Sequence, residues 1–247
     1  MPEQSTAHPT IVSFLLDRTG SMEGIKDETI SGFNGYLDAL EREAGDLVAF
    51  TLLQFDSHSI DTLYTGAKLS EVARLTSETY QPRARTPLID ACVKTIKVTE
   101  ETIARRRDKS RVIVVFQTDG EENASRRHTL DELRDLIERR TAEEWQFIFL
   151  GADMNAYKTA SNFGILKEAT LAYSGKRSRR SMTASRGIFP RLHSAGGSRA
   201  LLTAAEAGCW GSLYRPGKKE VGRPRSAVAV RFLACGAAVL ALMQRGE

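Results

Sequence analysis

The sequence has little cysteine and little histidine. Its three cysteines, Cys92, Cys209 and Cys235, are an odd number without CxxC spacing, and its four histidines stand far apart. Such cysteines cannot supply the disulfide framework of a small secreted domain, and their spacing does not match a zinc site. The composition therefore excludes a disulfide-stapled domain and a histidine or cysteine metal cluster, and it fits a reducing compartment.

The sequence also lacks a secretory signal and a long apolar run. Residues 1–10 are polar, whereas a signal has a basic start followed by about 7–15 apolar residues. The longest uninterrupted apolar run, residues 232–243, has 12 residues, and a membrane-spanning helix needs about 20. We therefore expect a flexible N-terminus over residues 1–10, no membrane span and a cytoplasmic location.

The excess of positive charge belongs to one part of the chain. The 247 residues carry a formal net charge of +4, but residues 1–175 carry −7 and residues 176–247 carry +11. The segment 176–199 is rich in Arg, Ser and Gly and follows neither a helical nor a strand period. Residues 174–247 are therefore expected to form an irregular, largely disordered basic tail with a weak helix over 227–243. A functional arm and the product of a reading-frame shift both remain open as its origin.

Two hydrophobic patterns alternate along residues 11–173, which we expect to form one domain. Short, nearly continuous apolar runs predict strands that are buried on both faces of a parallel sheet. Apolar residues at steps of three and four predict amphipathic helices. Strands are predicted at 11–16, 47–55, 59–64, 112–116, 147–150 and 169–173, and helices around 30–40, from Thr86-Pro87 to Arg105-Arg106-Arg107, from Thr129 to Ile137, and at 155–162.

This alternation indicates an α/β fold with a doubly wound, mostly parallel sheet. The predicted strand 59–64 follows the strand 47–55 after only three residues. Parallel strands need a much longer crossover connection, so these two strands must be antiparallel. We therefore expect the strand 59–64 to form one antiparallel edge of the sheet.

Oxygen-bearing side chains follow the predicted parallel strands. Asp17, Thr19 and Ser21 come after the first strand, Asp119 comes after the strand 112–116, and Thr86 opens a helix between them. In doubly wound sheets, ligands bind at the carboxyl ends of the strands. Two carboxylates and three hydroxyls are ligands for hard divalent cations such as Mg²⁺, Mn²⁺ or Ca²⁺. The five residues are therefore our candidate metal ligands.

Each of these segments also has an ordinary structural explanation. Residues 17–21 can form a helix-capping turn, in which Gly20 permits a sharp bend. Pro87 suits the first position of a helix, with Thr86 then at the N-cap. Asp-Gly at 119–120 is common in turns, and Glu121 and Glu122 are expected to form a solvated acidic rim. The metal hypothesis depends on the conjunction of the three segments at successive strand ends.

At these residues the sequence resembles the von Willebrand factor A (vWA) domain family. The metal-ion-dependent adhesion site of that family reads Asp-x-Ser-x-Ser, then a Thr, then an Asp that is often followed by Gly. Asp17, Thr19, Ser21, Thr86 and Asp119 match this pattern residue by residue. Thr19 stands where the family usually has Ser, so the hydroxyl is kept and an extra methyl group must be accommodated.

The resemblance covers about residues 10–172, and two short segments make it more specific. Leu16–Met22 and Thr118–Asn123 look like the corresponding segments of bacterial and phage intracellular members. The resemblance does not cover the tail, where the family usually has a final amphipathic helix. It implies a vWA domain over residues 11–173 with a Rossmann-like fold.

The resemblance also implies a function. In the family, the hydroxyls contact the metal directly, the carboxylates often act through water, and an acidic residue of a partner protein commonly supplies the last ligand. The implied function is a divalent-metal-dependent protein-interaction module with Mg²⁺, Mn²⁺ or Ca²⁺ as cofactor. It is not the function of an enzyme.

Two other classes of function remain open as alternatives. One is a Mg²⁺-dependent phosphoryl-transfer or phosphatase enzyme on a similar sheet, but haloacid-dehalogenase-type phosphatases need Asp-x-Asp where this chain has Asp17-Arg18-Thr19. There is also no GxxxxGK[ST] loop for nucleotide phosphates. The other is nucleic-acid binding through the 14 basic residues of the tail, whose few aromatic residues give no sign of base reading, so no specific nucleic acid is expected.

Overall fold

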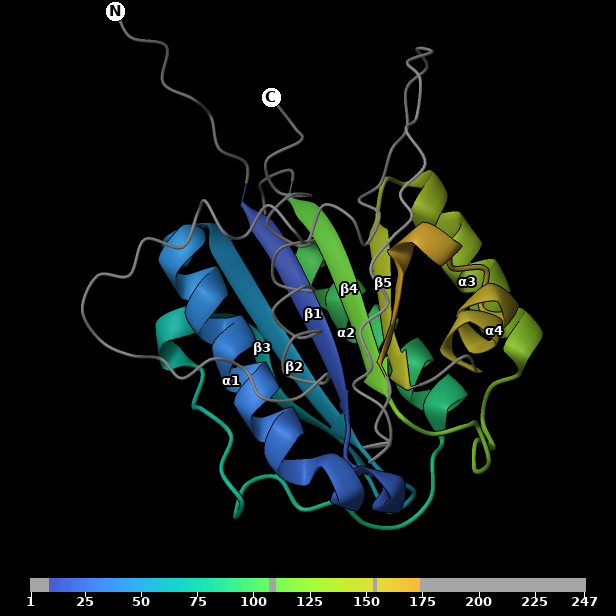
Figure 1. Ribbon diagram of the computed structural model, residues 1–247. Helices are drawn as coiled ribbons and strands as arrows, with labels where there is room; N and C mark the ends of the chain where they lie inside the picture. The colour runs from blue at the N-terminus through green and yellow to red at the C-terminus, as the bar shows by residue number, and fades with distance from the viewer. Residues whose placement is uncertain (1–8, 107–109, 153–154, 174–247) are drawn as a thin grey trace, which may run out of the picture.

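The computed structural model describes residues 9–106, 110–152 and 155–173. These residues form a six-stranded sheet with helices on both faces (Figure 1). The strand order is β3-β2-β1-β4-β5-β6, in which only the β2–β3 pair is antiparallel. The strands are β1 (Thr10–Asp17), β2 (Val48–Phe55), β3 (Ile60–Lys68), β4 (Arg111–Thr118), β5 (Gln146–Ala152) and β6 (Thr170–Tyr173). The predicted α/β fold with an antiparallel edge strand is confirmed.

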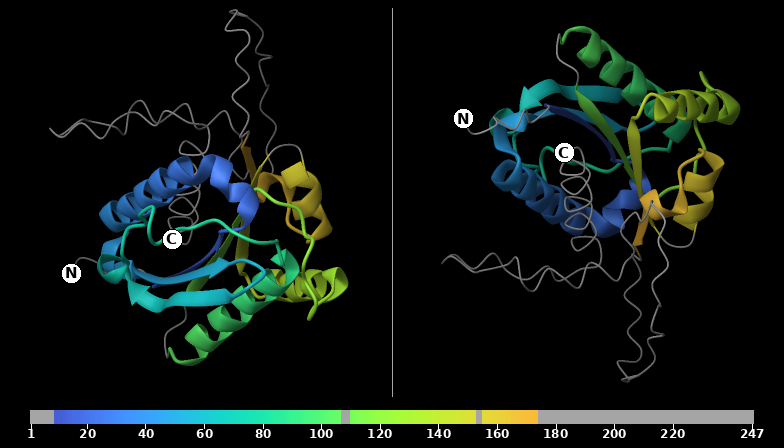
Figure 2. Two further views of the ribbon diagram at one scale, coloured as in Figure 1. Left: turned by 90° about the horizontal axis from the view of Figure 1, so that it is seen from below. Right: turned by 90° about the horizontal axis from the view of Figure 1, so that it is seen from above.

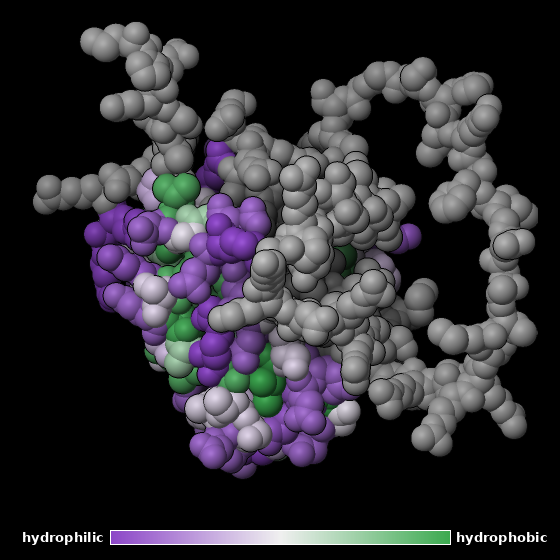
Figure 3. Space-filling model, turned by 60° about the vertical axis from the view of Figure 1, so that its left-hand side comes forward, coloured by the Kyte–Doolittle hydropathy of each residue, from purple (hydrophilic) through white to green (hydrophobic). Residues whose placement is uncertain are grey.

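Four α-helices cover the sheet. The helices are α1 (Lys26–Glu43), α2 (Leu88–Ala104), α3 (Leu130–Ala142) and α4 (Asn155–Asn162). Helix α1 covers one face of the sheet, whereas α2, α3 and α4 cover the other (Figure 2). Their apolar side chains belong to two separate cores. A view from the α1 side shows that hydrophilic side chains dominate the described surface there, with smaller apolar areas between them (Figure 3).

The central strands are apolar because both of their faces are covered. Every residue of β1 is buried, and neighbouring side chains point into opposite layers, as the pleat of a strand requires. Phe14 and Leu16 contribute to the core beneath α1, and Leu15 contributes to the core beneath α2 and α3. In β4, Val115 and Phe116 divide in the same way. A strand of this kind cannot alternate polar and apolar residues, which explains the continuous apolar runs.

The helix after Thr86-Pro87 differs from the prediction at both ends. Pro87 occupies the N-cap position of α2, so Thr86 lies one residue before the cap. The first-turn amides of Ile89 and Asp90 donate instead to the Glu122 carboxylate and the Ser125 hydroxyl. The helix ends at Ala104, and its last turn contains no basic residue. The amide of Arg106 donates to the carbonyl of Ile103, a tighter bond that closes the helix before the arginines. The predictions of a Thr86 cap and a basic last turn are therefore wrong.

The other elements confirm the sequence pattern closely. Thr129 caps α3 in a capping box with Glu132, as its spacing predicts. The short helix α4 and the final strand β6 lie where they are expected. Within the described residues, no helix has the length and apolar character needed to cross a membrane. The expectations for residues 1–8 and for the tail 174–247 lie outside the described residues.

Candidate metal centre

Three of the five candidate ligands lie where β1 ends, at the lower edge of the sheet in Figure 1. Asp17 is the last residue of β1 and is fully buried. The amide of Thr19 donates to Asp17 Oδ1 at 2.6 Å, and the hydroxyls of Thr19 and Ser21 are 3.2 Å apart. Ser21 lies in a 3₁₀ helix, η1 (Gly20–Ile25), that leads into α1. Thr19 is buried, so its extra methyl group is accommodated within the wall of the site.

The other two candidate ligands come from different loops. Asp119 directly follows β4, and the Ser21 hydroxyl donates to its Oδ1 at 2.7 Å. Thr86 lies beside Gly120: a Cβ built on this glycine would be 3.1 Å from Thr86 Oγ1 and 3.4 Å from Ser21 Oγ. The structure therefore brings all five predicted residues together, from three loops, at the carboxyl end of the sheet.

The two glycines of the site are needed for close approach and not for an unusual backbone angle. Neither has a positive φ, so Gly20 permits the turn after β1 through its lack of a side chain and not through a left-handed backbone angle. A Cβ on Gly20 would be 3.2 Å from the carbonyl oxygen of Ala84, which also accepts a hydrogen bond from the Gly20 amide at 3.1 Å. A side chain at either position would separate loops that the site brings together.

Thr86 is fixed through its backbone. Its amide donates to Asn123 Oδ1 at 2.9 Å, and its carbonyl accepts from the Asn123 amide at 3.1 Å. These two bonds join the loop before α2 to the loop after β4, which carries Asp119. The hydroxyl of Thr86 therefore does not have to cap the helix, which is consistent with the displaced cap of α2.

Comparison with known proteins rests on structure, because the sequence matches no protein-family model and no curated protein. The chain is similar to the vWF domain of the type V pili tip protein Mfa5 from Porphyromonas gingivalis, with 10% identity, 98% of this chain and 99% of that chain covered, and a TM-score of 0.58. The chain has the fold of a von Willebrand factor A domain.

Two further solved structures share this fold at similarly low identity. The pilus adhesin SpaC from Lactobacillus rhamnosus GG matches with 11% identity and a TM-score of 0.54, and the match covers 70% of this chain and 29% of SpaC. Proximal thread matrix protein 1 from the mussel byssus matches with 15% identity and a TM-score of 0.51, over 68% of this chain and 44% of that protein. The chain thus spans less than half of either protein, and the likeness concerns the vWA fold alone.

The two carboxylates of the site differ in burial: Asp17 is fully buried, whereas Asp119 is partly exposed. Thr118 Oγ1 donates to Asp17 Oδ2 at 2.5 Å, and the Tyr80 hydroxyl donates to the Asp17 carbonyl. Burial raises the pKa of the Asp17 carboxyl to about 7, although the hydrogen bonds from Thr118 and Thr19 lower it, and nearby Asp119 raises it further. Burial also raises the pKa of Asp119. Two negative charges close together, one of them buried, raise the free energy of the site. A bound dication would compensate these charges.

The donor set fits a hard divalent cation. Among the described residues, no group of three or more His, Cys, Asp and Glu side chains is placed to hold a metal. These residues therefore do not form a zinc-type cluster. The centre instead combines two carboxylates, which can neutralise a dication, with three neutral hydroxyls. Oxygen donors of this kind suit Mg²⁺, Mn²⁺ and Ca²⁺.

An ion network that was not predicted from the sequence supports the site. Arg18 Nε and Arg83 Nε both donate to Asp56 Oδ2 at 2.8 Å, and Asp56 is buried. Burial acts to raise the pKa of Asp56, but Arg83, the backbone amides of Ser59 and His58, and Arg18 together hold that pKa below its ordinary value. The Arg83 amide also donates to the Arg18 carbonyl. The signal was available, because Asp56 directly follows a buried parallel strand.

Two further carboxylates hold the loop after β4. Asp90, in the first turn of α2, accepts hydrogen bonds from the backbone amides of Arg126, Arg127 and His128. Glu122 accepts from the backbone amides at 89, 124 and 125 and from the Ser125 hydroxyl. The prediction that Glu122 belongs to a solvated rim is therefore wrong, whereas Glu121 is exposed. Nothing in the local sequence distinguishes these two glutamates.

Gly120→Ala is expected to weaken Mg²⁺ binding about tenfold without unfolding the domain. The added methyl group would fall 3.1 Å from Thr86 Oγ1, and relief of such overpacking typically costs about 1–3 kcal/mol. Isothermal titration calorimetry measures the change. Gly24→Ala is the matched control, because a Cβ there meets nothing within 4 Å. Equal affinities for Gly120→Ala and Gly24→Ala would contradict the position of Thr86 in the centre.

Proposed function

We propose that this chain is a divalent-metal-dependent protein-interaction module. The observation that carries the proposal is the convergence of Asp17, Thr19, Ser21, Thr86 and Asp119, from three loops, at the carboxyl end of a vWA-type sheet. These side chains would hold Mg²⁺, Mn²⁺ or Ca²⁺. When bound, the ion supplies a coordination position for an anionic oxygen of the partner.

The residues of the chain have separate tasks in this proposal. Asp17 and Asp119 provide the negative charge that offsets the dication, and the hydroxyls provide donors without adding repulsion. Thr118 holds one oxygen of Asp17 through its 2.5 Å hydrogen bond, and the backbone pairing of Asn123 holds Thr86. Because each donor is positioned by the surrounding structure, little reorganisation would accompany binding.

An acidic side chain of a partner protein is the proposed last ligand. A carboxylate adds one negative charge to a dication that two carboxylates already offset, so the complex does not accumulate a large excess charge. The proposal describes a binding site and not an enzyme. In support, Cys92 is fully buried in α2, and burial raises the pKa of its thiol well above the ordinary value, which makes it a poor nucleophile.

The subtype and the location are also part of the proposal. The segments Leu16–Met22 and Thr118–Asn123, which resemble those of bacterial and phage intracellular members, support an intracellular vWA module that acts in the cytoplasm. Imaging of the tagged full-length chain in its host tests the location independently of the metal site.

Excess Mg²⁺ is expected to raise the melting temperature of the protein. A ligand that binds only the folded state stabilises it by about 2.7 kcal/mol at a hundred times Kd, which corresponds to roughly 5–10 °C for a domain of this size. Asp17→Ala should remove this response, whereas Asp27→Ala, which deletes an exposed carboxylate next to the site, should keep it. A thermal-shift titration measures all three proteins. An equal response of the parent and Asp17→Ala would rule out the metal assignment.

Capture of a specific protein partner is expected to depend on the same centre. EDTA and Thr86→Ala should each reduce capture at least tenfold, whereas Thr141→Ala, an exposed threonine on α3, should leave it unchanged. Affinity capture followed by quantitative mass spectrometry gives the ratios. A partner that is fully retained in EDTA would place the interaction on another surface.

A generic phosphomonoester assay with Mg²⁺ tests the rival enzyme function. Turnover that Asp17→Ala abolishes would establish that function.

A further inference from the structure

Three exposed arginines lie in two of the loops that form the candidate metal centre. Arg85 directly precedes Thr86, and Arg126 and Arg127 lie in the loop that Asp90 ties to the first turn of α2. All three side chains are exposed. Asp90 lies in the first turn of α2, which begins two residues after Thr86. We call Arg85, Arg126 and Arg127 the arginine rim.

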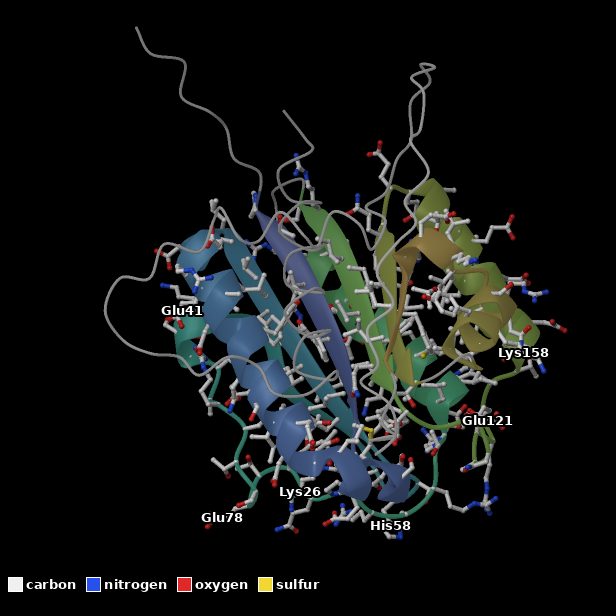
Figure 4. All side chains as sticks on the ribbon, in the orientation of Figure 1. Lys26, Glu41, His58, Glu78, Glu121 and Lys158 are labelled. Atoms are coloured by element: carbon white, nitrogen blue, oxygen red, sulfur yellow. The ribbon has the colours of Figure 1, made fainter. Side chains whose placement is uncertain are left out.

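The arginine rim is positively charged toward solvent. Among the described residues, none of its three guanidinium groups has an ion-pair partner, although ten other ion pairs are formed. The carboxylates beneath it, Asp90 and Glu122, accept hydrogen bonds from backbone amides. Glu121 is the exposed carboxylate of the same loop, and Figure 4 shows it at this edge of the sheet.

The backbone of the rim is fixed even though the loop has no regular secondary structure. The Arg85 amide donates to Ser57 Oγ at 3.1 Å, and its guanidinium donates to the Asn123 carbonyl at 3.0 Å. The Arg126 amide donates to Asp90 Oδ2 at 2.8 Å. The rim therefore presents its charges from a positioned loop, which lowers the entropic cost of binding a partner.

The segment that follows Ser21 has the opposite net charge, because Glu23, Asp27 and Glu28 outnumber Lys26. Glu23 in η1 and Asp27 in α1 are both exposed. An acidic segment that reaches the centre is repelled on the η1 side and attracted on the α2 side, so the charges give it a direction as well as a site.

Resting on the proposed function, we infer that the partner contributes an acidic segment and not a single acidic residue. One carboxylate reaches the metal centre, and further carboxylates two to four residues away contact the arginine rim. An extended chain advances about 3.3 Å per residue, so such carboxylates follow the first at about 7–13 Å and can reach different arginines of the rim. The segment runs from the centre across the start of α2, away from Glu23 and Asp27.

Two synthetic peptides test this inference by fluorescence anisotropy with the full chain. The first is a labelled Gly/Ser nonapeptide with one central Asp, and the second carries the same Asp followed by three Glu residues. The variant R85Q/R126Q/R127Q is expected to weaken the second peptide about tenfold in Mg²⁺, as the sum of three exposed charge interactions, and the first less than twofold. In EDTA the variant and the parent should bind the second peptide equally, because any residual binding then lies elsewhere on the chain.

The matched control, R105Q/R134Q/R139Q, removes the same charge at the C-cap of α2 and in α3. Equal weakening of the second peptide by both triple variants, or equal affinity of the two peptides for the parent, would overturn the inference.

The remaining outcomes separate the inference from the proposed function. Binding of the second peptide that depends on Mg²⁺ but not on the rim would overturn the inference and leave the proposed function standing. Dependence on the rim without Mg²⁺ would overturn the proposed function. Displacement by oligo(dT) at lower concentration than by unlabelled peptide would assign the rim to nucleic acid, against the inference. An unchanged melting temperature of the triple variant excludes unfolding as the cause.

Discussion

Asp17→Asn is expected to stabilise the metal-free protein at pH 8 and to lose this advantage by pH 4. Burial raises the pKa of Asp17 from 3.8 to about 7, so the folded protein holds this proton more tightly than the unfolded chain does. The contribution of Asp17 to the free energy of unfolding is therefore fully present below pH 3.8, and it is lost as the pH rises through about 7. The loss amounts to at most ~4 kcal/mol, at about 1.36 kcal/mol per pKa unit.

The asparagine side chain can keep the local hydrogen bonds. Its carbonyl oxygen can accept from the Thr19 amide, and its amide can donate to Thr118 Oγ1, whose own hydrogen can turn toward the Gly120 carbonyl at 3.3 Å. The substitution therefore removes the charge with little change in packing, which makes it the isosteric test of the buried carboxylate.

Urea unfolding in EDTA between pH 4 and pH 8 measures the difference between Asp17→Asn and the parent. Asp56 does not interfere, because its pKa is lowered, and the stability it contributes is present above the unfolded pKa and is lost only as the pH falls through the folded value. In excess Mg²⁺ at pH 8 the difference should shrink, since only the parent keeps both carboxylates and gains stability from binding the ion. A free-energy difference that does not change with pH would contradict the raised pKa.

Asp56→Asn is expected to destabilise the domain by about 3 kcal/mol. Asp56 is fully buried and neutralises Arg18, which is only 12% exposed, and it also accepts from Arg83. Removal of one member of a buried ion pair leaves the other charge without compensation, which typically costs 3–5 kcal/mol. Asp61, 43% exposed, keeps its 2.6 Å contact with Arg18 and moderates the loss.

Asp61→Asn serves as the control for Asp56→Asn, because it removes an exposed member of the same network and should cost less than about 1 kcal/mol. Urea unfolding at pH 7 gives both values, provided the m-values agree. Equal costs for the two substitutions would show that the network is not organised around Asp56. Because Arg18 and Arg83 connect two of the loops of the metal centre, Asp56→Asn should also weaken Mg²⁺ binding.

The fold was predictable because the sheet is covered on both faces. Strands such as β1 and β4 must be apolar throughout, and their short continuous runs are distinct from the spaced apolar residues of α1 and α2. The β2–β3 pairing followed from the length of a connection. These features depend on neighbouring residues in the sequence, so no tertiary information was needed.

The candidate ligands were predictable for a related reason, whereas their supports were not. Asp17 and Asp119 directly follow strands, and parallel strands end at one edge. Asp90, Asn123 and, in part, Glu122 act through hydrogen bonds to backbone groups that are more than 30 residues away. A backbone amide has the same chemistry in every residue except proline, so the sequence carries no mark of the partner. The roles of such side chains become visible only when the loops are placed in space.

The pairing of Ser21 with Asp119 has a consequence for the order of assembly. These residues are 98 positions apart, and contacts of this range form only after the intervening chain has closed. The complete set of ligands therefore exists only once β4 lies beside β1. An ion that needs this set would hold the finished structure together and slow its unfolding, without hastening its formation. In a cell, the supply of divalent cation would then govern how long each folded molecule lasts and not how quickly new ones appear.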